Sequence, residues 1–388
     1  MDVVNTAPPQ KTDAPAMAGV PFPIGSRVQS RYSARPTPVS NLASSNSFAP
    51  IQLPPTGFVR RIGLTFQVTV TMSAGGAVVA GDGPWNLVNN ITLTDATGNA
   101  ITQPVSGYTL YLLNKYFSSG ARSTKIPRAY ASPQLGPQYA YSATATTGTA
   151  FFRLDLDLEQ DCETGYGSVP NLDANSTLQL KIDVNPASVA FAGTLTAATV
   201  AVTVDSEYWA PIGNTVGGMP AETAPVGLGD FLETRLETQT VNALAENVIN
   251  VNNRGGLIRG MLLVSRAAGV RTAFAPATNA GLVYDNNAIV EGLTIETHQD
   301  RVARAYGYVG AELATSYAPL SAGVLPGLDR GVHVMNFGAD SGGRDSWLTT
   351  RVGTLLQVKL TPGASATSME LITLLMQAKD GAAFYGRR

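Results

Sequence analysis

The clearest pattern along the chain is a strict alternation of apolar and polar residues in several segments. Within 58–73, one face would collect the side chains of Ile62, Leu64, Phe66, Val68 and Val70. This period of two is typical of a strand with one buried and one exposed face. The pattern recurs over 150–161, 177–184 and 198–211, so the first half of the chain predicts antiparallel β structure.

A different spacing follows the strand predicted at 87–94. After the turn Asp95–Gly98, Ser106 can cap a helix whose apolar stripe is Thr109, Leu112, Leu113, Tyr116 and Phe117. A similar unit returns at 288–317, where Thr297 and Asp300 approximate a capping box. Its apolar stripe comprises Val302, Ala305, Tyr306, Val309 and Leu313. Each half of the chain therefore predicts one short helix after a strand.

Further correspondences between the halves point to an internal duplication. Segment 256–269 matches 58–71, and the alternating segment 369–376 matches 200–204. Leu-Gln-Leu-Lys at 178–181 matches Leu-Gln-Val-Lys at 356–359. Four elements in one order predict two copies of one β-rich domain.

The boundaries follow from breaks in these patterns. Residues 1–47 form a Pro-rich arm with no sustained period, which we expect to be flexible. The first domain covers 48–211, the Gly-rich segment 212–229 is the linker, and the second domain covers 230–388. A long irregular excursion is expected from 118 to 148.

These patterns favour an all-β fold of two tandem eight-stranded jelly rolls, each with one short helix and long loops. A pair of immunoglobulin-like sandwiches is the alternative. That fold usually needs only about 100 residues per domain and gives no reason for a helix after the same strand in both halves.

Composition narrows the possible functions. Only 14% of the 388 residues are charged and the net charge is -2, which argues against direct nucleic-acid binding. The arm is weakly basic through Lys11, Arg27, Arg31 and Arg35, and we expect it to be a simple tail or to contact a neighbouring subunit or an anionic membrane. With one cysteine, no signal-peptide pattern and no long apolar run, the sequence predicts a cytoplasmic site of synthesis.

Reactive chemistry finds little support. His298 and His333 lack further metal ligands at a known spacing, and Cys162 lacks a basic neighbour, so no catalytic residue and no cofactor are expected. Asp155, Asp157 and Glu159 alternate along one predicted strand, and such carboxylates are weak candidates for a Ca²⁺ site. A solvated strand face is the simpler interpretation. The same aspartates could also be offered as a glycosidase pair, but they flank no predicted cleft.

One stretch resembles a known family. The run Gly83-Pro84-Trp85-Asn86-Leu87-Val88 leading into a strand, the turn Asp95–Gly98 and the helix start Gly107-Tyr108 are similar to the double jelly-roll major capsid proteins of tailless icosahedral bacteriophages with an internal membrane, the tectivirus type. The resemblance extends in plan over nearly the whole chain. The family often has a Gln-rich or helical N-terminus, whereas this arm is Pro-rich.

The resemblance implies a structural virion protein rather than an enzyme. It implies homotrimeric capsomers of pseudo-hexagonal outline that tile an icosahedral capsid over an internal membrane, with penton and minor capsid proteins as further partners. Trp85, Tyr108 and Tyr306 would then be packing anchors. The alternative is a two-domain carbohydrate-binding fibre or adhesin protein, although Trp85, Trp209 and Trp347 are scattered rather than clustered.

Overall fold

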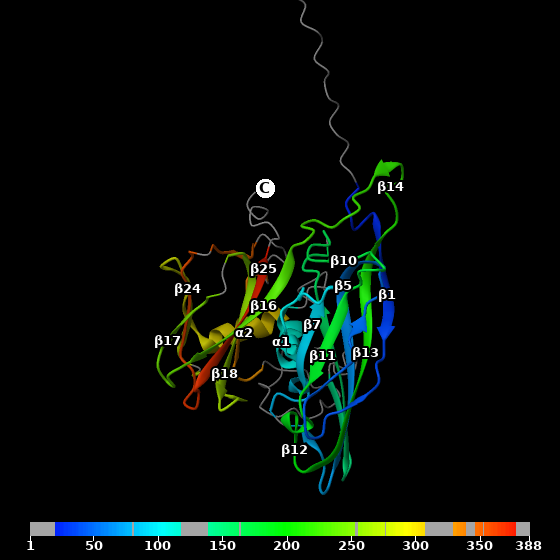
Figure 1. Cartoon of the computed structure of the whole chain (residues 1–388). Helices are drawn as coiled ribbons and strands as arrows, with labels where there is room; N and C mark the ends of the chain where they lie inside the picture. The colour runs from blue at the N-terminus through cyan, green and yellow to red at the C-terminus, as the bar shows by residue number, and fades with distance from the viewer. Residues whose placement is uncertain are drawn as a thin grey trace, which may run out of the picture.

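The computed structural model describes residues 20–79, 81–117, 139–162, 164–252, 255–275, 277–306, 329–338, 346–351 and 353–377. Two β-sandwiches lie side by side, with helix α1 (Gly107–Phe117) between them and helix α2 (Ile295–Tyr306) against the second sandwich (Figure 1). Neither of these helices is long and apolar enough to cross a membrane, and the described residues contain no other that is.

The first sandwich has a seven-stranded sheet and a four-stranded sheet. The larger sheet contains β1 (Ser26–Ala34), β13 (Leu195–Pro211), β5 (Gly57–Met72), β9 (Thr147–Asp157) and β8 (Tyr139–Ala143) in this order, with β10 (Val169–Asn171) and β2 (Val39–Ser40) at its margins. The smaller sheet contains β3 (Asn46–Ser47), β4 (Ile51–Gln52), β11 (Gln179–Val184) and β7 (Val88–Thr94). Two-residue strands β6 (Val78–Val79) and β12 (Phe191–Ala192) pair beside them.

The second sandwich repeats this plan. Its larger sheet contains β16 (Phe231–Thr240), β25 (Ser368–Gln377), β18 (Leu257–Ala267) and β19 (Val270–Arg271), and both β22 (Val332–Asn336) and β23 (Leu348–Thr349) pair with β18. Its smaller sheet runs β17 (Asn247–Asn250), β24 (Leu356–Leu360), β20 (Asn279–Tyr284), β21 (Asn287–Thr294).

The strand order identifies both sandwiches as jelly rolls. In each large sheet the first strand pairs with the last, giving β1-β13-β5-β9 and β16-β25-β18-β22. The small sheets correspond as β4-β11-β7 and β17-β24-β20. The predicted double jelly roll is therefore confirmed, because the two halves share one order of pairing and one position for the helix.

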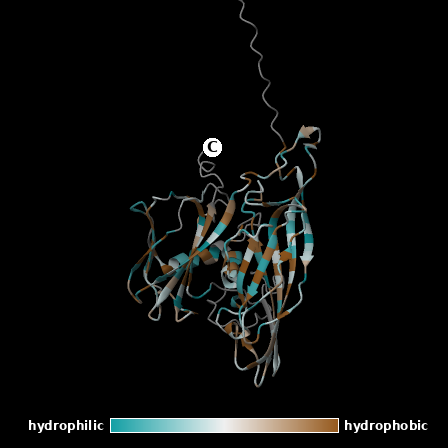
Figure 2. Cartoon of the chain, in the orientation of Figure 1, coloured by the Kyte–Doolittle hydropathy of each residue, from teal (hydrophilic) through white to brown (hydrophobic). Residues whose placement is uncertain are grey.

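Alternation along the strands builds the core as predicted. Phe66 lies opposite Val202 and also opposite Phe152 on the neighbouring strand, and all three are buried. Figure 2 shows hydrophobic and hydrophilic positions alternating along the strands of the first sandwich. One apolar core fills that sandwich and continues through α1 to the near face of the second, where Leu262, Val334 and Leu374 belong to it.

The two helices are capped in the same way. The Thr109 backbone N–H donates to Ser106 Oγ at 3.1 Å, as the sequence predicts, and the Thr297 N–H donates to Thr294 Oγ1 at 3.2 Å. The expected capping box at Thr297 is therefore wrong by one turn, because the N-cap is Thr294.

Three expectations about the connecting segments need correction. Residues 26–34 of the expected arm form β1, which pairs with β13 along its length, so these residues belong to the first sandwich. Residues 139–143 of the expected excursion form β8. Within the linker, β14 (Thr215–Val216) and β15 (Met219–Pro220) make a small hairpin that projects at one end of the molecule (Figure 1).

Candidate functional site at the joint between the sandwiches

Helix α1 is the element that joins the two sandwiches. Every one of its residues is buried, and it contacts β7 and β9 of the first sandwich and β22 of the second. The approach is close at Gly260 of β18, where an added Cβ would lie 2.1 Å from Phe117 Cε1. Gly260 is therefore required by packing at this point.

A buried carboxylate of the second sandwich receives the polar side chains of α1. Lys115 Nζ lies 2.6 Å from Asp329 Oδ2, and neither side chain is exposed. The hydroxyls of Tyr116 and Tyr111 donate to the same carboxylate at 2.9 and 3.2 Å. Arg271 Nη1 lies 3.7 Å from Asp329 Oδ1.

A second carboxylate makes the reciprocal contact. Asp82, in the turn before the 3₁₀ turn Trp85–Leu87, accepts from Arg266 Nη1 and Arg271 Nε, both at 2.6 Å. Arg266 also lies 2.7 Å from Glu370. The Tyr108 ring lies 5.4 Å from the guanidinium groups of both Arg266 and Arg271. We call Asp82, Lys115, Arg266, Arg271, Asp329 and Glu370 the joint cluster.

The joint cluster is electrically balanced, with three cations and three carboxylates. Burial alone would raise the pKa of Asp329, but Lys115 and Arg271 hold that pKa below its usual value. Burial lowers the pKa of Lys115, and Asp329 opposes this shift. Since one charge of each main pair comes from each sandwich, the cluster is complete only when the sandwiches are docked.

Sequence reasoning missed this cluster because its members lie far apart in the chain. Lys115 and Asp329 are 214 residues apart. One signal was present: Lys115 is the only charged residue of α1, and it lies in an otherwise apolar and aromatic helix.

Two of the three predicted aromatic anchors, Trp85 and Tyr108, lie beside the cluster. Trp85 stacks on Tyr111 with ring centroids 3.8 Å apart, and both rings are buried. Tyr108 is also buried, and burial raises its pKa well above the ordinary value. Tyr306 ends α2, and its side chain lies outside the described residues.

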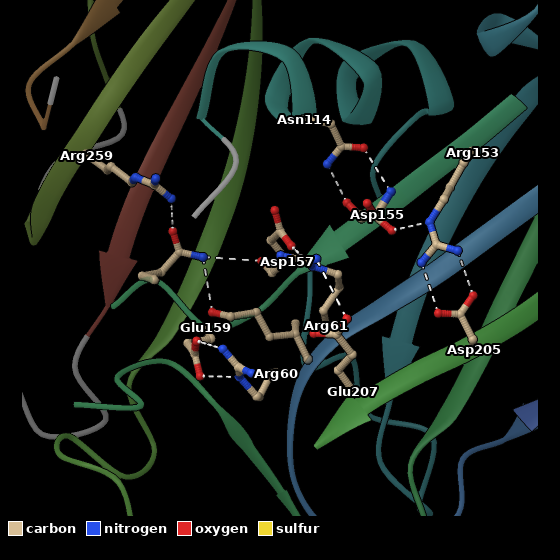
Figure 3. A network of polar contacts seen from close by, with 12 residues as sticks. Arg60, Arg61, Asn114, Arg153, Asp155, Asp157, Glu159, Asp205, Glu207 and Arg259 are labelled. Atoms are coloured by element: carbon tan, nitrogen blue, oxygen red, sulfur yellow. Dashed lines mark hydrogen bonds and ion pairs between the residues drawn. The ribbon is translucent and has the colours of Figure 1, made fainter. Parts of the chain in front are cut away.

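The candidate metal ligands are each paired with an arginine instead of with one another (Figure 3). Asp157 accepts from Arg61 Nε at 2.6 Å, and Asp155 accepts from Arg153 Nε at 2.9 Å. Arg153 also reaches Asp205 across Gly63, where a Cβ would lie 1.9 Å from its Nη2. Burial, followed by the charge of Asp157, raises the pKa of Asp155.

Glu159 does not share the face of these aspartates. Strand β9 ends at Asp157, and the buried Glu159 carboxylate instead accepts from Arg60 Nε and Nη2, at 2.8 and 2.7 Å, and from Trp209 Nε1. The described part of the chain contains no group of three or more His, Cys, Asp or Glu residues arranged to hold a metal ion.

The side chain of Asn114 completes the contact between α1 and this region (Figure 3). Its Nδ2 donates to the Asp155 carbonyl at 2.6 Å, and its Oδ1 accepts from the Asp155 N–H at 2.8 Å. Asn114 therefore pairs with the part of β9 that extends beyond β8, as a neighbouring strand would.

The remaining candidates are dispersed. Arg27 and Arg31 lie exposed on β1, Arg35 is exposed just after it, and Lys11 lies outside the described residues. The three tryptophans are all buried, so they form no exposed aromatic platform for a sugar. Cys162 is partly buried, and burial followed by the charge of Glu159 raises its thiol pKa, which disfavours the reactive thiolate.

Comparisons with known proteins establish the fold and not a family. No protein-family model matches the sequence, and no curated protein matches it. Solved structures do match. The STIV MCP has a TM-score of 0.57 at 13% identity, covering 93% of this chain and 100% of that one.

Two further structures agree. The major capsid protein P2 from Bacteriophage PM2 has a TM-score of 0.53 at 10% identity, covering 91% of this chain and 98% of that one. The Faustovirus major capsid protein has a TM-score of 0.53 at 8% identity, covering 91% and 90%. The chain thus shares a double jelly-roll fold with viral major capsid proteins over nearly its whole length.

Proposed function

We propose that this protein is the major coat protein of an icosahedral virion and forms its shell by binding to copies of itself. The observation that carries the proposal is the pair of equivalent jelly rolls docked through one buried joint. Solved structures of viral major capsid proteins share the double jelly-roll fold over at least 90% of the chain, which supports the proposal.

The two-sandwich plan gives a physical reason for the shell geometry. Three copies of a two-sandwich chain present six similar sandwiches around a threefold axis, and this homotrimer would fill a pseudo-hexagonal place in a closed lattice. That packing needs the two sandwiches at one fixed relative position. The buried joint cluster supplies such a constraint, because a shift would separate charges that no longer reach water.

The finer parts of the proposal concern partners. We place the protein in the capsid of a tailless bacteriophage assembled in the host cytoplasm, with penton and minor capsid proteins at special positions of the lattice. The N-terminal segment, with Lys11 and the exposed Arg27, Arg31 and Arg35, would contact the internal membrane or a neighbouring capsomer. We also propose that 212–229 links two folding units, the first of which includes β1.

A catalytic function is not part of the proposal, since the carboxylates of the joint cluster and of Figure 3 are held by arginine or lysine. A carbohydrate-binding fibre protein is also not favoured, because the three tryptophans are buried.

The test is the mass of the purified full-length chain by light scattering. The proposal predicts a stable homotrimer of about 122 kDa, three times the chain mass of 40.5 kDa. A chain that stays monomeric at micromolar concentration, and that forms no shells when mixed with the other proteins of its virion, would refute the proposal.

A further inference from the structure

The only two histidines of the chain lie against each other. His298 is in the first turn of α2 and His333 is in β22, and their ring centroids are 4.3 Å apart. His333 is only 1% exposed, and the Phe274 ring lies 6.1 Å from it at a steep angle. A buried imidazole such as that of His333, packed on the partly buried ring of His298, needs an explanation.

The hydrogen bonds of the two rings differ. Neither ring nitrogen of His333 has a partner among the described residues. His298 Nε2 lies 2.5 Å from the Val334 carbonyl, and since a carbonyl only accepts, Nε2 carries the proton. Among the described residues, β22 pairs with β18 alone. The hydrogen bond of His298 to Val334 attaches α2 to β22.

Among the described side chains, no carboxylate favours a proton on either ring. On α2, Glu296, Asp300, Arg301 and Arg304 are exposed, and Asp300 is paired with Arg304. The one charged residue of β21 is Glu291, whose side chain lies outside the described part of the structure.

The charges on the other neighbouring strands are directed elsewhere. From β18 and β19, Arg259 contacts Gln160, whereas Arg266 and Arg271 bind Asp82. Before β22, Asp329 is held by Lys115 and is followed by the exposed Arg330. β20 carries no charged residue, and β24 and β25 carry Lys359 and Glu370, the latter paired with Arg266.

Both imidazoles accordingly resist protonation. Burial lowers the pKa of His298, and although the Val334 carbonyl opposes this shift, Arg301 adds to it. Burial lowers the pKa of His333 further, and a charge on His298 would lower it again.

We propose that His298 and His333 form an acid-sensitive latch that holds α2 on β22 while both imidazoles are neutral and releases α2 when they are protonated. The inference goes beyond the proposed function and stands without it.

The sign and size of the effect follow from linkage. Each folded-state pKa lies below the ordinary value of about 6.5, so the latch is fully stabilising above that pH and weakens as the pH falls below it. When a histidine is protonated in the open state and neutral in the closed state, the closed-to-open ratio falls about tenfold for each unit by which the pH drops. If both histidines behave in this way, the ratio falls about a hundredfold per unit. Helix α2 contacts mainly β21 and β22, so the release is local.

The test combines two measurements on the full-length chain. With ¹³C-labelled histidine, NMR gives two ring signals, because the chain has two histidines. Hydrogen exchange of segment 295–306, corrected for intrinsic rates, reports the opening of α2. Between pH 7 and 5.5 we expect protection of this segment to fall at least tenfold more than that of β5.

Matched variants assign the effect. His333→Phe keeps a ring in the core without a titrating nitrogen, and His298→Gln keeps an N–H donor for Val334. Both should reduce the pH dependence of exchange, and the double variant should abolish it. Arg304→Gln, on the exposed side of the same helix, should keep it.

Three results would overturn the latch. One is a histidine signal that titrates near 6.5 while α2 stays protected. The second is protection of 295–306 that does not change down to pH 5. The third is a double variant with the pH dependence of the natural chain. The first two need no variant, so the proposal stays testable even if a substitution prevents folding.

Discussion

Removing the lysine of the joint cluster should uncouple the two sandwiches. In Lys115→Met a side chain of similar length and no charge would remove the nearest cation from Asp329, whereas Arg271, at 3.7 Å, and two tyrosine hydroxyls would stay beside it. Lys115 and Asp329 are both fully buried and 2.6 Å apart. Breaking such a pair by removing one partner costs about 3–5 kcal/mol, because an uncompensated charge stays buried.

The loss should also depend on pH. Without Lys115 the pKa of Asp329 rises, since burial raises it and the main opposing charge is gone. The stability from ionised Asp329 is present above its unfolded pKa of about 3.9 and is lost as pH falls through the folded value. That acid loss belongs to the natural chain. In the variant the raised pKa lets Asp329 take up a proton more readily in the folded state, so the destabilisation relative to the natural chain should be greatest near neutral pH and should shrink as the pH falls.

Urea unfolding followed by tryptophan fluorescence measures this prediction, because Trp85 stacks on Tyr111 next to the cluster. We expect the variant to unfold in two separate transitions, one for each sandwich. Arg304→Met is the control: it breaks the exposed Asp300–Arg304 pair, with an expected cost below about 0.5 kcal/mol. The double variant Lys115→Met/Asp329→Leu should recover part of the loss. If Lys115→Met costs no more than the control, the joint does not depend on this ion pair.

Three further predictions follow from the same contacts. Gly260→Ala should lower the free energy of unfolding by about 1–3 kcal/mol, because the added Cβ would overlap Phe117. The control Gly213→Ala should be neutral, because nothing lies within 4 Å of its added Cβ. Equal urea midpoints for the two variants would contradict the close packing at Gly260. Asn114→Leu should lower the free energy of unfolding by about 1–3 kcal/mol, because the Asp155 N–H and carbonyl lose their hydrogen bonds to Asn114. Faster hydrogen exchange at 153–157 would show this loss. Deletion of residues 1–19 should leave the protein trimeric while weakening shell or membrane attachment. Deletion of 1–34 should also destabilise the first sandwich by exposing the edge of β13, and equal stability of the two deletions would show that β1 contributes nothing.

The sequence predicted the strands that bury one face and missed those that do not. β5, β9 and β13 alternate between core and surface, so period two revealed them. β1 is mostly exposed, with a burial pattern that lacks alternation, and it is held by its backbone pairing with β13. A strand fixed by a partner more than 170 residues away leaves little trace in its own side chains.

The candidate site shows the same limit. Period two placed Asp155, Asp157 and Glu159 on one face, but β9 ends at Asp157 and the next carboxylate turns into the interior toward Arg60. The joint cluster depends on how the two sandwiches dock, which no local pattern encodes. The duplication itself was visible, because each copy repeats the same helix after the same strand.

Electron microscopy of the purified oligomer would show how the sandwiches are arranged. We expect particles with threefold symmetry and six similar lobes, one for each jelly roll of three chains, because the joint holds the two sandwiches of each chain side by side. Single two-lobed particles, or an open filament with no threefold centre, would contradict this expectation.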